Sequence, residues 1–138
     1  MTTVLVAGTF DGLHKGHEGL FRQAKAYGDR LVVVVARDKT VEQVKGRLPR
    51  MGEEARHEAV QAHPLVDEAI LGKFGDKYEV IAEAAPDVIV LGYDQEVFTE
   101  VLEERLAERG ILPRIIRAAP FHPEIYKSSL LYEKGENG

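Results

Sequence analysis

The stretch Thr3-Val-Leu-Val-Ala-Gly8 opens the chain with a short apolar run closed by glycine. Such a run is typical of a strand buried on both faces of a parallel sheet. Helical spacing then predicts a helix over Gly16–Tyr27 with Gly28 as its C-terminal stop. Its buried face is expected to carry Leu20, Phe21, Ala24 and Tyr27. The continuous β-branched run Arg30–Ala36 predicts a second buried strand, so the unit is strand, loop, helix, strand.

The same alternation continues along the chain. Further strands are predicted at Glu68–Leu71, Asp87–Leu91 and Arg114–Arg117. Further helices are predicted at Glu53–His63, Tyr78–Ala85, Glu96–Arg109 (burying Val97, Val101, Leu102 and Leu106) and Lys127–Glu133. Asp38 is expected to cap a helical turn through Val41 and Val44. This alternation predicts an α/β fold, a Rossmann-like doubly wound parallel sheet of five strands with helices on both faces. We expect one domain over residues 1–134 and a flexible tail at 135–138.

Composition excludes several classes of function. The 138 residues contain no cysteine, which excludes disulfides, thiolate metal sites and a cysteine nucleophile. A formal net charge of -5 argues against a nucleic-acid partner, because duplex-binding proteins usually carry a basic excess. The longest apolar run, Leu31–Ala36, is far shorter than the roughly 20 residues of a membrane span. No signal-peptide pattern opens the sequence, so a cytoplasmic protein without membrane contact is expected.

Polar residues that directly follow a strand are the candidates for a binding site. In doubly wound sheets, ligands bind beyond the carboxyl ends of the strands, where the strand order reverses. The segments at these positions are Thr9–His17, Arg37–Asp38, Gly72–Lys73, Gly92–Asp94 and the region after Arg117.

The most informative of these segments is His14-Lys-Gly-His17, where the loop after the first strand becomes a helix. Free backbone N–H groups and the positive end of the helix dipole favour phosphate there, and imidazole N–H groups would add directed donors. Two other interpretations stay open at this point. The histidines could only cap or pack, or they could hold a metal with Asp11, although no fourth ligand is evident.

Gly8-Thr-Phe-Asp11 followed by His14-Lys-Gly-His17 resembles the signature of the cytidylyltransferase-like nucleotidyltransferases, and the similarity extends over nearly the whole chain. Ala36-Arg-Asp38 and Leu91-Gly-Tyr-Asp-Gln95 are most similar to the archaeal-type FAD synthases, and Lys127-Ser-Ser129 lies where the family has a Ser/Thr-rich motif. The resemblance implies transfer of AMP from ATP to FMN, giving FAD and pyrophosphate. Transfer from CTP to glycerol 3-phosphate or a similar small phosphate is the alternative. A non-catalytic nucleotide-binding module on the same sheet is a third hypothesis.

The resemblance and the positions of the residues assign candidate roles. His14, His17 and Lys45 are the expected catalytic residues, since the reaction needs positioning and charge stabilisation rather than a general base. The expected nucleotide contacts are Gly8, Thr9, Phe10, His14, His17, Gly92, Asp94, Ser128 and Ser129. The expected acceptor contacts are Asp11, Asp38, Lys45 and Arg47, with turn ordering as a second role for Asp11 and helix capping for Asp38.

The expected partners follow from the same resemblance. They are ATP and FMN, or CTP and a small phosphate, with Mg²⁺ or another divalent cation carried by the nucleotide and no metal ligands from the protein. A homodimer is implied by the resemblance alone. The remaining histidines, His57, His63 and His122, are expected to pack or to lie at the surface, and no role is assigned to the loop 118–127.

Overall fold

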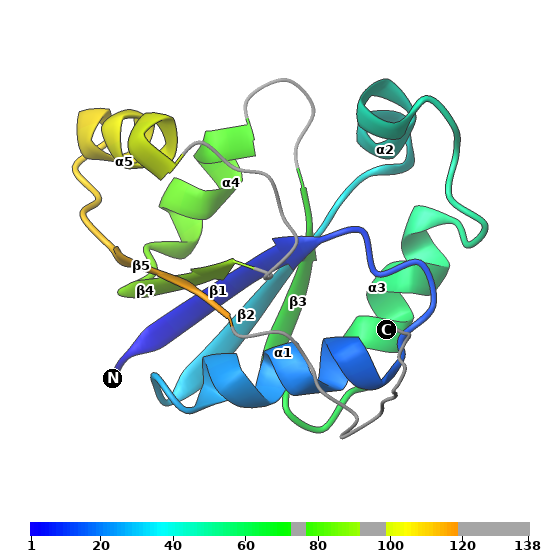
Figure 1. Cartoon of the computed structure of the whole chain (residues 1–138), viewed down its shortest axis with the longest axis horizontal. Coiled ribbons are helices and arrows are strands. Elements are labelled where there is room, and N and C mark those ends of the chain that lie inside the picture. Colours follow the sequence, from blue (N-terminus) through cyan, green and yellow to red (C-terminus); the bar gives the residue numbers. More distant parts are fainter. Residues whose placement is uncertain (73–76, 92–98, 119–138) are drawn as a thin grey trace, which may run out of the picture.

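The continuous apolar runs of the sequence form the strands of one sheet in the computed structural model, which describes residues 1–72, 77–91 and 99–118. The strands are β1 (Thr3–Gly8), β2 (Arg30–Val35), β3 (Glu68–Leu71), β4 (Val88–Leu91) and β5 (Arg114–Arg117). They lie in the order β3-β2-β1-β4-β5, and every neighbouring pair is parallel (Figure 1). The predicted five-stranded doubly wound sheet is confirmed.

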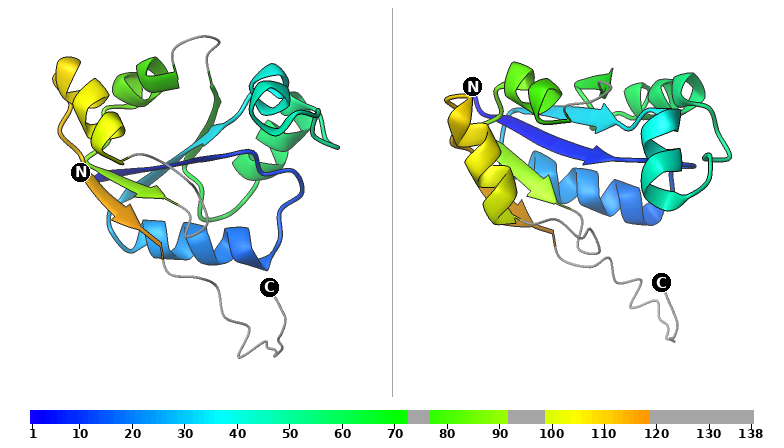
Figure 2. Two further views of the ribbon diagram at one scale, coloured as in Figure 1. Left: turned by 45° about the horizontal axis from the view of Figure 1, so that its top comes forward. Right: turned by 90° about the horizontal axis from the view of Figure 1, so that it is seen from above.

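Helices cover both faces of this sheet. They are α1 (Lys15–Lys25), α2 (Asp38–Lys45), α3 (Glu53–Gln61), α4 (Lys77–Ala84) and α5 (Thr99–Glu108). On one face, Phe21 of α1 and Val60 of α3 belong to the same buried core. On the other face, Val80 of α4 and Leu106 of α5 form a second core. Helix α2 stands beyond the ends toward which β1 and β2 point (Figure 2).

The order of the strands reverses between β1 and β4. From β1 the chain proceeds to β2 and β3 on one side and then crosses to β4 and β5 on the other. Ligand sites of doubly wound sheets form at the carboxyl ends of the strands that flank such a reversal. The loop after β1 and helix α2 both lie at this end of the sheet (Figure 1).

Gly28 has a different role from the one expected. Helix α1 ends at Lys25, and its C-terminal cap is Ala26 in ordinary right-handed geometry. Glycine is required at position 28 because an added Cβ would lie only 2.7 Å from the carbonyl oxygen of Thr2. The residue therefore permits a close approach of two backbone segments and does not terminate the helix.

Two residues expected on buried helix faces lie at the surface instead. The side chain of Tyr27 is 40% exposed, and the guanidinium of Arg114 lies 5.6 Å from its ring centroid. Val101 is also 40% exposed, whereas Leu102 and Leu106 of the same helix are buried as predicted. The buried stripe of α5 is therefore narrower than the apolar spacing suggests.

Several predictions fall outside the described residues. They are the helix Lys127–Glu133, the tail 135–138, the loop 118–127 beyond Ala118, and the first residues of the helix predicted at Glu96–Arg109, among them Val97. The extent of the domain over residues 1–134 stays a prediction. Within the described ranges, none of the helices has the length and apolar character needed to cross a membrane.

Candidate active site

The loop between β1 and α1 turns at Phe10 and Gly12, whose φ angles are +56° and +94°. Such left-handed geometry is uncommon for a residue with a side chain, and it tends to occur at functional sites. Phe10 is buried, and its ring centroid lies 5.7 Å from that of Phe21 and 5.2 Å from that of His17. The hydrophobic core thus holds the loop in a strained form and fixes the position of His17.

His14 and His17 begin α1 as a reciprocal capping pair. The Nδ1 atom of His14 accepts the N–H of Gly16 at 3.0 Å, and the Nδ1 atom of His17 accepts the N–H of His14 at 3.3 Å. A nitrogen that accepts a hydrogen bond carries no hydrogen, so each neutral ring bears its hydrogen on Nε2. The two ring centroids are 4.0 Å apart, so both imidazole rings lie together at the start of α1.

This arrangement shows the capping role that the sequence leaves open, and binding of a phosphate group by the two histidines stays a prediction. Each histidine caps the helix through its Nδ1 atom, while the α1 dipole adds positive potential at the same point. An added Cβ at Gly16 would lie 2.8 Å from Cε1 of His14, so glycine allows the His14 ring to fold over the first turn. The geometry suits an anion such as a phosphate group.

A metal site built from Asp11, His14 and His17 finds no support. The carboxylate of Asp11 accepts the N–H of Arg50 at 2.8 Å through Oδ2 and the N–H of Met51 at 2.9 Å through Oδ1. In the described part of the chain, no three His, Asp or Glu side chains are placed to hold a metal ion. Asp11 orders the segment before α3, and its contact with an acceptor stays a prediction.

The pH dependence of stability should reveal the hydrogen bonds that the Asp11 carboxylate accepts. Hydrogen bonds from the N–H groups of Arg50 and Met51 hold the pKa of the Asp11 carboxyl below its ordinary value of 3.8. Its contribution to stability is therefore present above that ordinary value and is lost as the pH falls through the lower folded-state pKa. We expect Asp11→Ala to be less stable than wild type at about pH 6 and to lose less stability between about pH 6 and pH 2.5. Urea denaturation followed by circular dichroism measures both.

The exposed Glu42 of α2 provides the control, and Glu42→Ala should keep the wild-type dependence. Some acid sensitivity should persist in every variant, because the side-chain hydrogen bond from Lys25 lowers the pKa of Asp67 as well. An Asp11→Ala protein with the full wild-type loss of stability in acid would contradict the assignment.

Arg56 of α3 organises the carboxyl end of the sheet from a fully buried position. Its Nη1 donates to the carbonyl oxygens of Thr9 and Ala36, which follow β1 and β2, at 2.8 Å each. Its Nε donates to the carbonyl oxygen of Met51 at 2.9 Å, and its Nη2 donates to Oδ1 of Asp38 at 2.6 Å. One guanidinium therefore joins the ends of two strands, the start of α2 and the segment before α3.

Asp38 does not cap α2, contrary to the expectation from its position. It is the first residue of the helix, Arg37 occupies the cap without a side-chain hydrogen bond, and the Asp38 carboxylate faces Arg56. The cap comes from α3, where the carboxylate of Glu53 accepts the N–H of Asp38 at 2.9 Å and pairs with Arg37 at 3.0 Å. Asp38 is not among the residues that line the small cavity, which holds the other acceptor candidates.

A small cavity of about 90 Å³ gathers most of the predicted acceptor contacts. Its lining residues are Thr9, Asp11, Val41, Lys45, Arg47, Leu48, Pro49 and Arg50. In the part of the chain that the structure describes, neither Lys45 nor Arg47 forms an ion pair. Their positive charges therefore remain available to an anion, next to the loop that carries the histidines.

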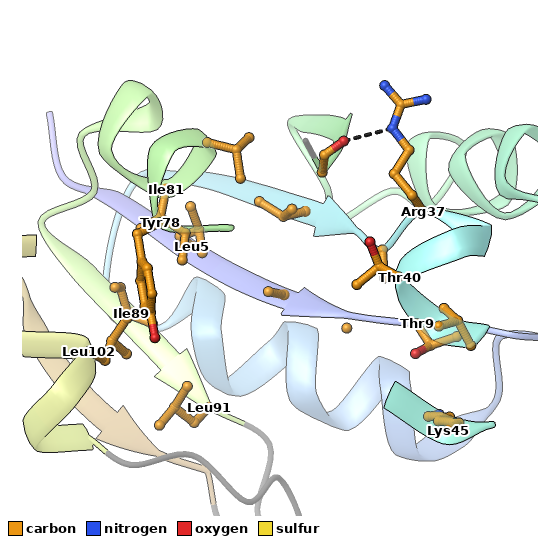
Figure 3. Close-up of a pocket in the computed structure, with 17 residues that line it drawn as sticks. Leu5, Thr9, Arg37, Thr40, Lys45, Tyr78, Ile81, Ile89, Leu91 and Leu102 are labelled. Atoms are coloured by element: carbon orange, nitrogen blue, oxygen red, sulfur yellow. Dashed lines mark hydrogen bonds between the residues drawn. The ribbon is translucent and has the colours of Figure 1, made fainter. Parts of the chain in front are cut away.

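A larger cavity of about 280 Å³ lies over the face of the sheet that α4 and α5 cover (Figure 3). Thr9, Val41 and Lys45 line both cavities, so the two meet at the carboxyl end of β1. Gly8 and Thr9, two of the predicted nucleotide contacts, form part of its wall, whereas the side chain of Phe10 belongs to the core. The remaining candidates, Gly92, Asp94, Ser128 and Ser129, lie outside the described residues, as does Lys73.

The other histidines have structural partners, as expected. Nε2 of His57 lies 2.7 Å from the carbonyl oxygen of Ala69. Nδ1 of His63 accepts the N–H of Leu65 at 3.1 Å, and its ring packs against Phe21. His122 is outside the described residues.

Sequence reasoning missed two features of this site, the network around Arg56 and the larger cavity. A signal for the first exists, because Arg56 lies four positions before the buried Val60 and hence on the buried face of its helix. A signal for the second is the pair Ala7 and Gly8, which replace large side chains at the end of β1. Neither signal identifies the residues that contact Arg56 or complete the cavity, because these residues lie on other elements.

Comparison with known proteins agrees with this geometry. The family model described as cytidylyltransferase-like matches residues 5–134. The FAD synthase of Aciduliprofundum boonei is 44% identical over 117 residues, which are 85% of this chain and 78% of that protein. The FAD synthase of Methanosarcina mazei is 46% identical over the same share of this chain and 76% of its own length.

A solved structure extends the likeness to the fold. The lipopolysaccharide core biosynthesis protein from Thermoplasma volcanium GSS1 superimposes with a TM-score of 0.83 at 39% identity, covering 88% of this chain and 98% of that one. The paired histidines at the start of α1, the strand order and the family match over nearly the whole length agree with one another. The chain belongs to the cytidylyltransferase-like family, as its histidine motif predicts.

Proposed function

We propose that this protein is an FAD synthase, an enzyme that transfers AMP from ATP to FMN. The observation that carries the proposal is the identity of 44% to 46% with FAD synthases over 85% of the chain. The site supports it, because the paired histidines begin the helix that follows β1, beside the strand reversal where ligands of such sheets bind.

In this reaction an oxygen of the FMN phosphate attacks the α-phosphorus of ATP. A new P–O bond forms, the bond from the α-phosphorus to its bridging oxygen breaks, and pyrophosphate leaves with that electron pair. The attacking phosphate is already ionised near neutral pH, so no side chain has to remove a proton. The protein accelerates the step by aligning two anions and stabilising the charge that moves onto the pyrophosphate.

The residues at the end of β1 fit this task. His14 and His17 donate from Nε2 to oxygens of the α-phosphate, and the backbone N–H groups of Thr9 and Phe10 approach the same group. Lys45 holds the acceptor phosphate and, with Arg47, balances the charge of the two substrates. The arrangement of the two rings and the shared cavity walls supports these roles. Further along the chain, Gly92 and Asp94 are proposed for the nucleoside, and Ser128 and Ser129 for the terminal phosphates.

A divalent cation such as Mg²⁺ fits this site as an ion bound to the triphosphate of the nucleotide. The described residues provide no cluster of three metal-ligating side chains, whereas triphosphate oxygens and water complete the shell that Mg²⁺ prefers. When bound, the cation neutralises charge on the leaving pyrophosphate. A homodimer, a cytoplasmic location and the lack of a nucleic-acid partner stay predictions from the sequence.

The choice of nucleotide and acceptor provides a direct test. With FMN, ATP and Mg²⁺, we expect FAD and pyrophosphate to form in equal amounts, and removal of the cation by a chelator should stop both. Chromatography of the flavins and a coupled pyrophosphate assay measure the two products. Matched reactions with CTP and with glycerol 3-phosphate should give at most traces. A labelled product from CTP alone would overturn the proposal, as would nucleotide binding without release of pyrophosphate.

A further inference from the structure

The larger cavity contains no residue of the histidine pair, and the phosphate chemistry described above leaves most of it unused. It lies between the sheet and helices α2, α4 and α5, and its volume of about 280 Å³ is close to the lower end of the range for small-molecule sites. Ala7 and Gly8 of β1 form its floor, so the sheet itself is accessible there. A rigid ligand can therefore lie flat against the sheet between the helices.

The two ends of this cavity differ in chemistry (Figure 3). Tyr78 and Ile81 of α4, Ile89 and Leu91 of β4 and Leu102 of α5 form one end. At the other end lie Thr9, Arg37, Thr40 and Lys45. The guanidinium of Arg37 is occupied by the carbonyl oxygen of Gly72 and by Glu53. Lys45 therefore supplies the cationic group of an elongated cavity that is aromatic and aliphatic at its far end.

A ligand that matches both ends has a large flat ring system and an anionic group on a flexible chain. We propose that this cavity binds the isoalloxazine ring of FMN at its apolar end, with the ribityl chain along Ala7 and Gly8 and the phosphate at Lys45. The proposal rests on the proposed function for the identity of the acceptor. Adenine is the weaker match, because it is smaller and has no apolar end like the dimethylbenzene ring of the flavin, which suits the aliphatic side chains of this end of the cavity.

This placement also puts the phosphate of the acceptor on the side of the histidine loop. Thr9 and Lys45 line both this cavity and the small basic cavity, and Thr9 begins the loop that leads to His14. A phosphate held at Lys45 therefore lies on the side of β1 where the loop with the histidines starts. The ring anchors the acceptor on the face covered by α4 and α5, while its phosphate lies beside the histidine loop.

Riboflavin tests the ring site without any chemistry, because it has the ring and the ribityl chain but no phosphate. We expect wild type to quench riboflavin fluorescence, and Ile81→Phe to weaken this binding about tenfold or more by overfilling the apolar end. The same change should raise KM for FMN, leave KM for ATP within about twofold, and leave inhibition by ribitol 5-phosphate, which lacks the ring, unchanged. The exposed Val101, which does not line the cavity, provides the matched control Val101→Phe.

Two further variants keep the test decisive. If Ile81→Phe fails to fold by circular dichroism, Ile81→Ala removes contacts only and should still weaken riboflavin binding. Lys45→Met should weaken binding of FMN about tenfold but leave riboflavin unchanged, since a single charged contact to phosphate is lost. Unchanged riboflavin binding in both Ile81 variants, or a rise in KM for ATP alone, would overturn the ring site.

The outcomes separate this inference from the proposed function. A protein that makes FAD but binds riboflavin equally well in wild type and the Ile81 variants retains its function and refutes the ring site. A protein that binds riboflavin in the cavity but makes no FAD from FMN and ATP retains the ring site and refutes the function.

Discussion

Replacing Arg56 with methionine should lower the free energy of unfolding by about 3–5 kcal/mol. Its side chain is fully buried, and methionine fills much of the space without replacing any of the donors. The change leaves the carbonyl oxygens of Thr9, Ala36 and Met51 without this partner and removes the cation that faces Asp38. Urea denaturation followed by circular dichroism measures the loss, and kcat should fall with it because the loop after β1 is no longer held.

Two comparisons show whether burial is the cause. Arg22 pairs with Glu18 at 3.2 Å on the surface, so Arg22→Met should cost less than about 1 kcal/mol. In the Arg56→Met background, Asp38→Leu should restore part of the lost stability, because it removes the carboxylate that has lost its partner. An Arg56→Met protein that unfolds at the same urea concentration as wild type would refute the role given to this residue.

Replacing His17 with asparagine should reduce kcat by about 100- to 1,000-fold and leave the fold intact. The amide oxygen of asparagine lies where Nδ1 of histidine lies, so it can still accept the N–H of His14 at the start of α1. Nothing in asparagine reaches the position of Nε2, so the donor proposed for the α-phosphate is lost. Thermal unfolding should change little, and steady-state kinetics should show the loss mainly in kcat.

The matched change at His63 provides the control. Nδ1 of His63 likewise accepts a backbone N–H, from Leu65, but His63 lies just beyond the C-terminal end of α3. His63→Asn should therefore leave kcat unchanged. His17→Gln, whose amide nitrogen can reach the Nε2 position, should retain more activity than His17→Asn. A His17→Asn enzyme within about threefold of the wild-type kcat would exclude Nε2 as a donor to the reacting phosphate.

The parts of the fold that were predictable are those that depend on short-range sequence patterns. Strands such as Glu68–Leu71 and Arg114–Arg117 have the predicted bounds, because an apolar run closed by a polar residue or glycine marks both ends of a strand. The start of α1 was equally predictable, since the two residues that cap it, His14 and His17, are only three positions apart. Local spacing is sufficient wherever the partners are neighbours in the sequence.

The parts that were not predictable depend on distant partners. Asp38 has the position of a helix cap, but it pairs with Arg56, 18 residues away, and Glu53 takes over the capping role. Tyr27 has apolar spacing yet lies at the surface beside Arg114, from a strand at the other end of the chain. Such pairs form only when the order of the strands brings the elements together. The larger cavity, built from six elements and their adjoining loops, has no local signature for the same reason.

The two separate hydrophobic cores have a consequence for how this enzyme can change over evolutionary time. Phe10 and Phe21, which support the histidine loop, belong to the core under α1 and α3, while Val80 and Leu102 belong to the core under α4 and α5. Substitutions in the second core would reshape the large cavity without altering the residues that hold the reacting phosphates. The protein can thus retain the transfer reaction while the acceptor that it prefers changes. Laboratory selection for activity on altered flavins should therefore produce substitutions mainly in α4 and α5.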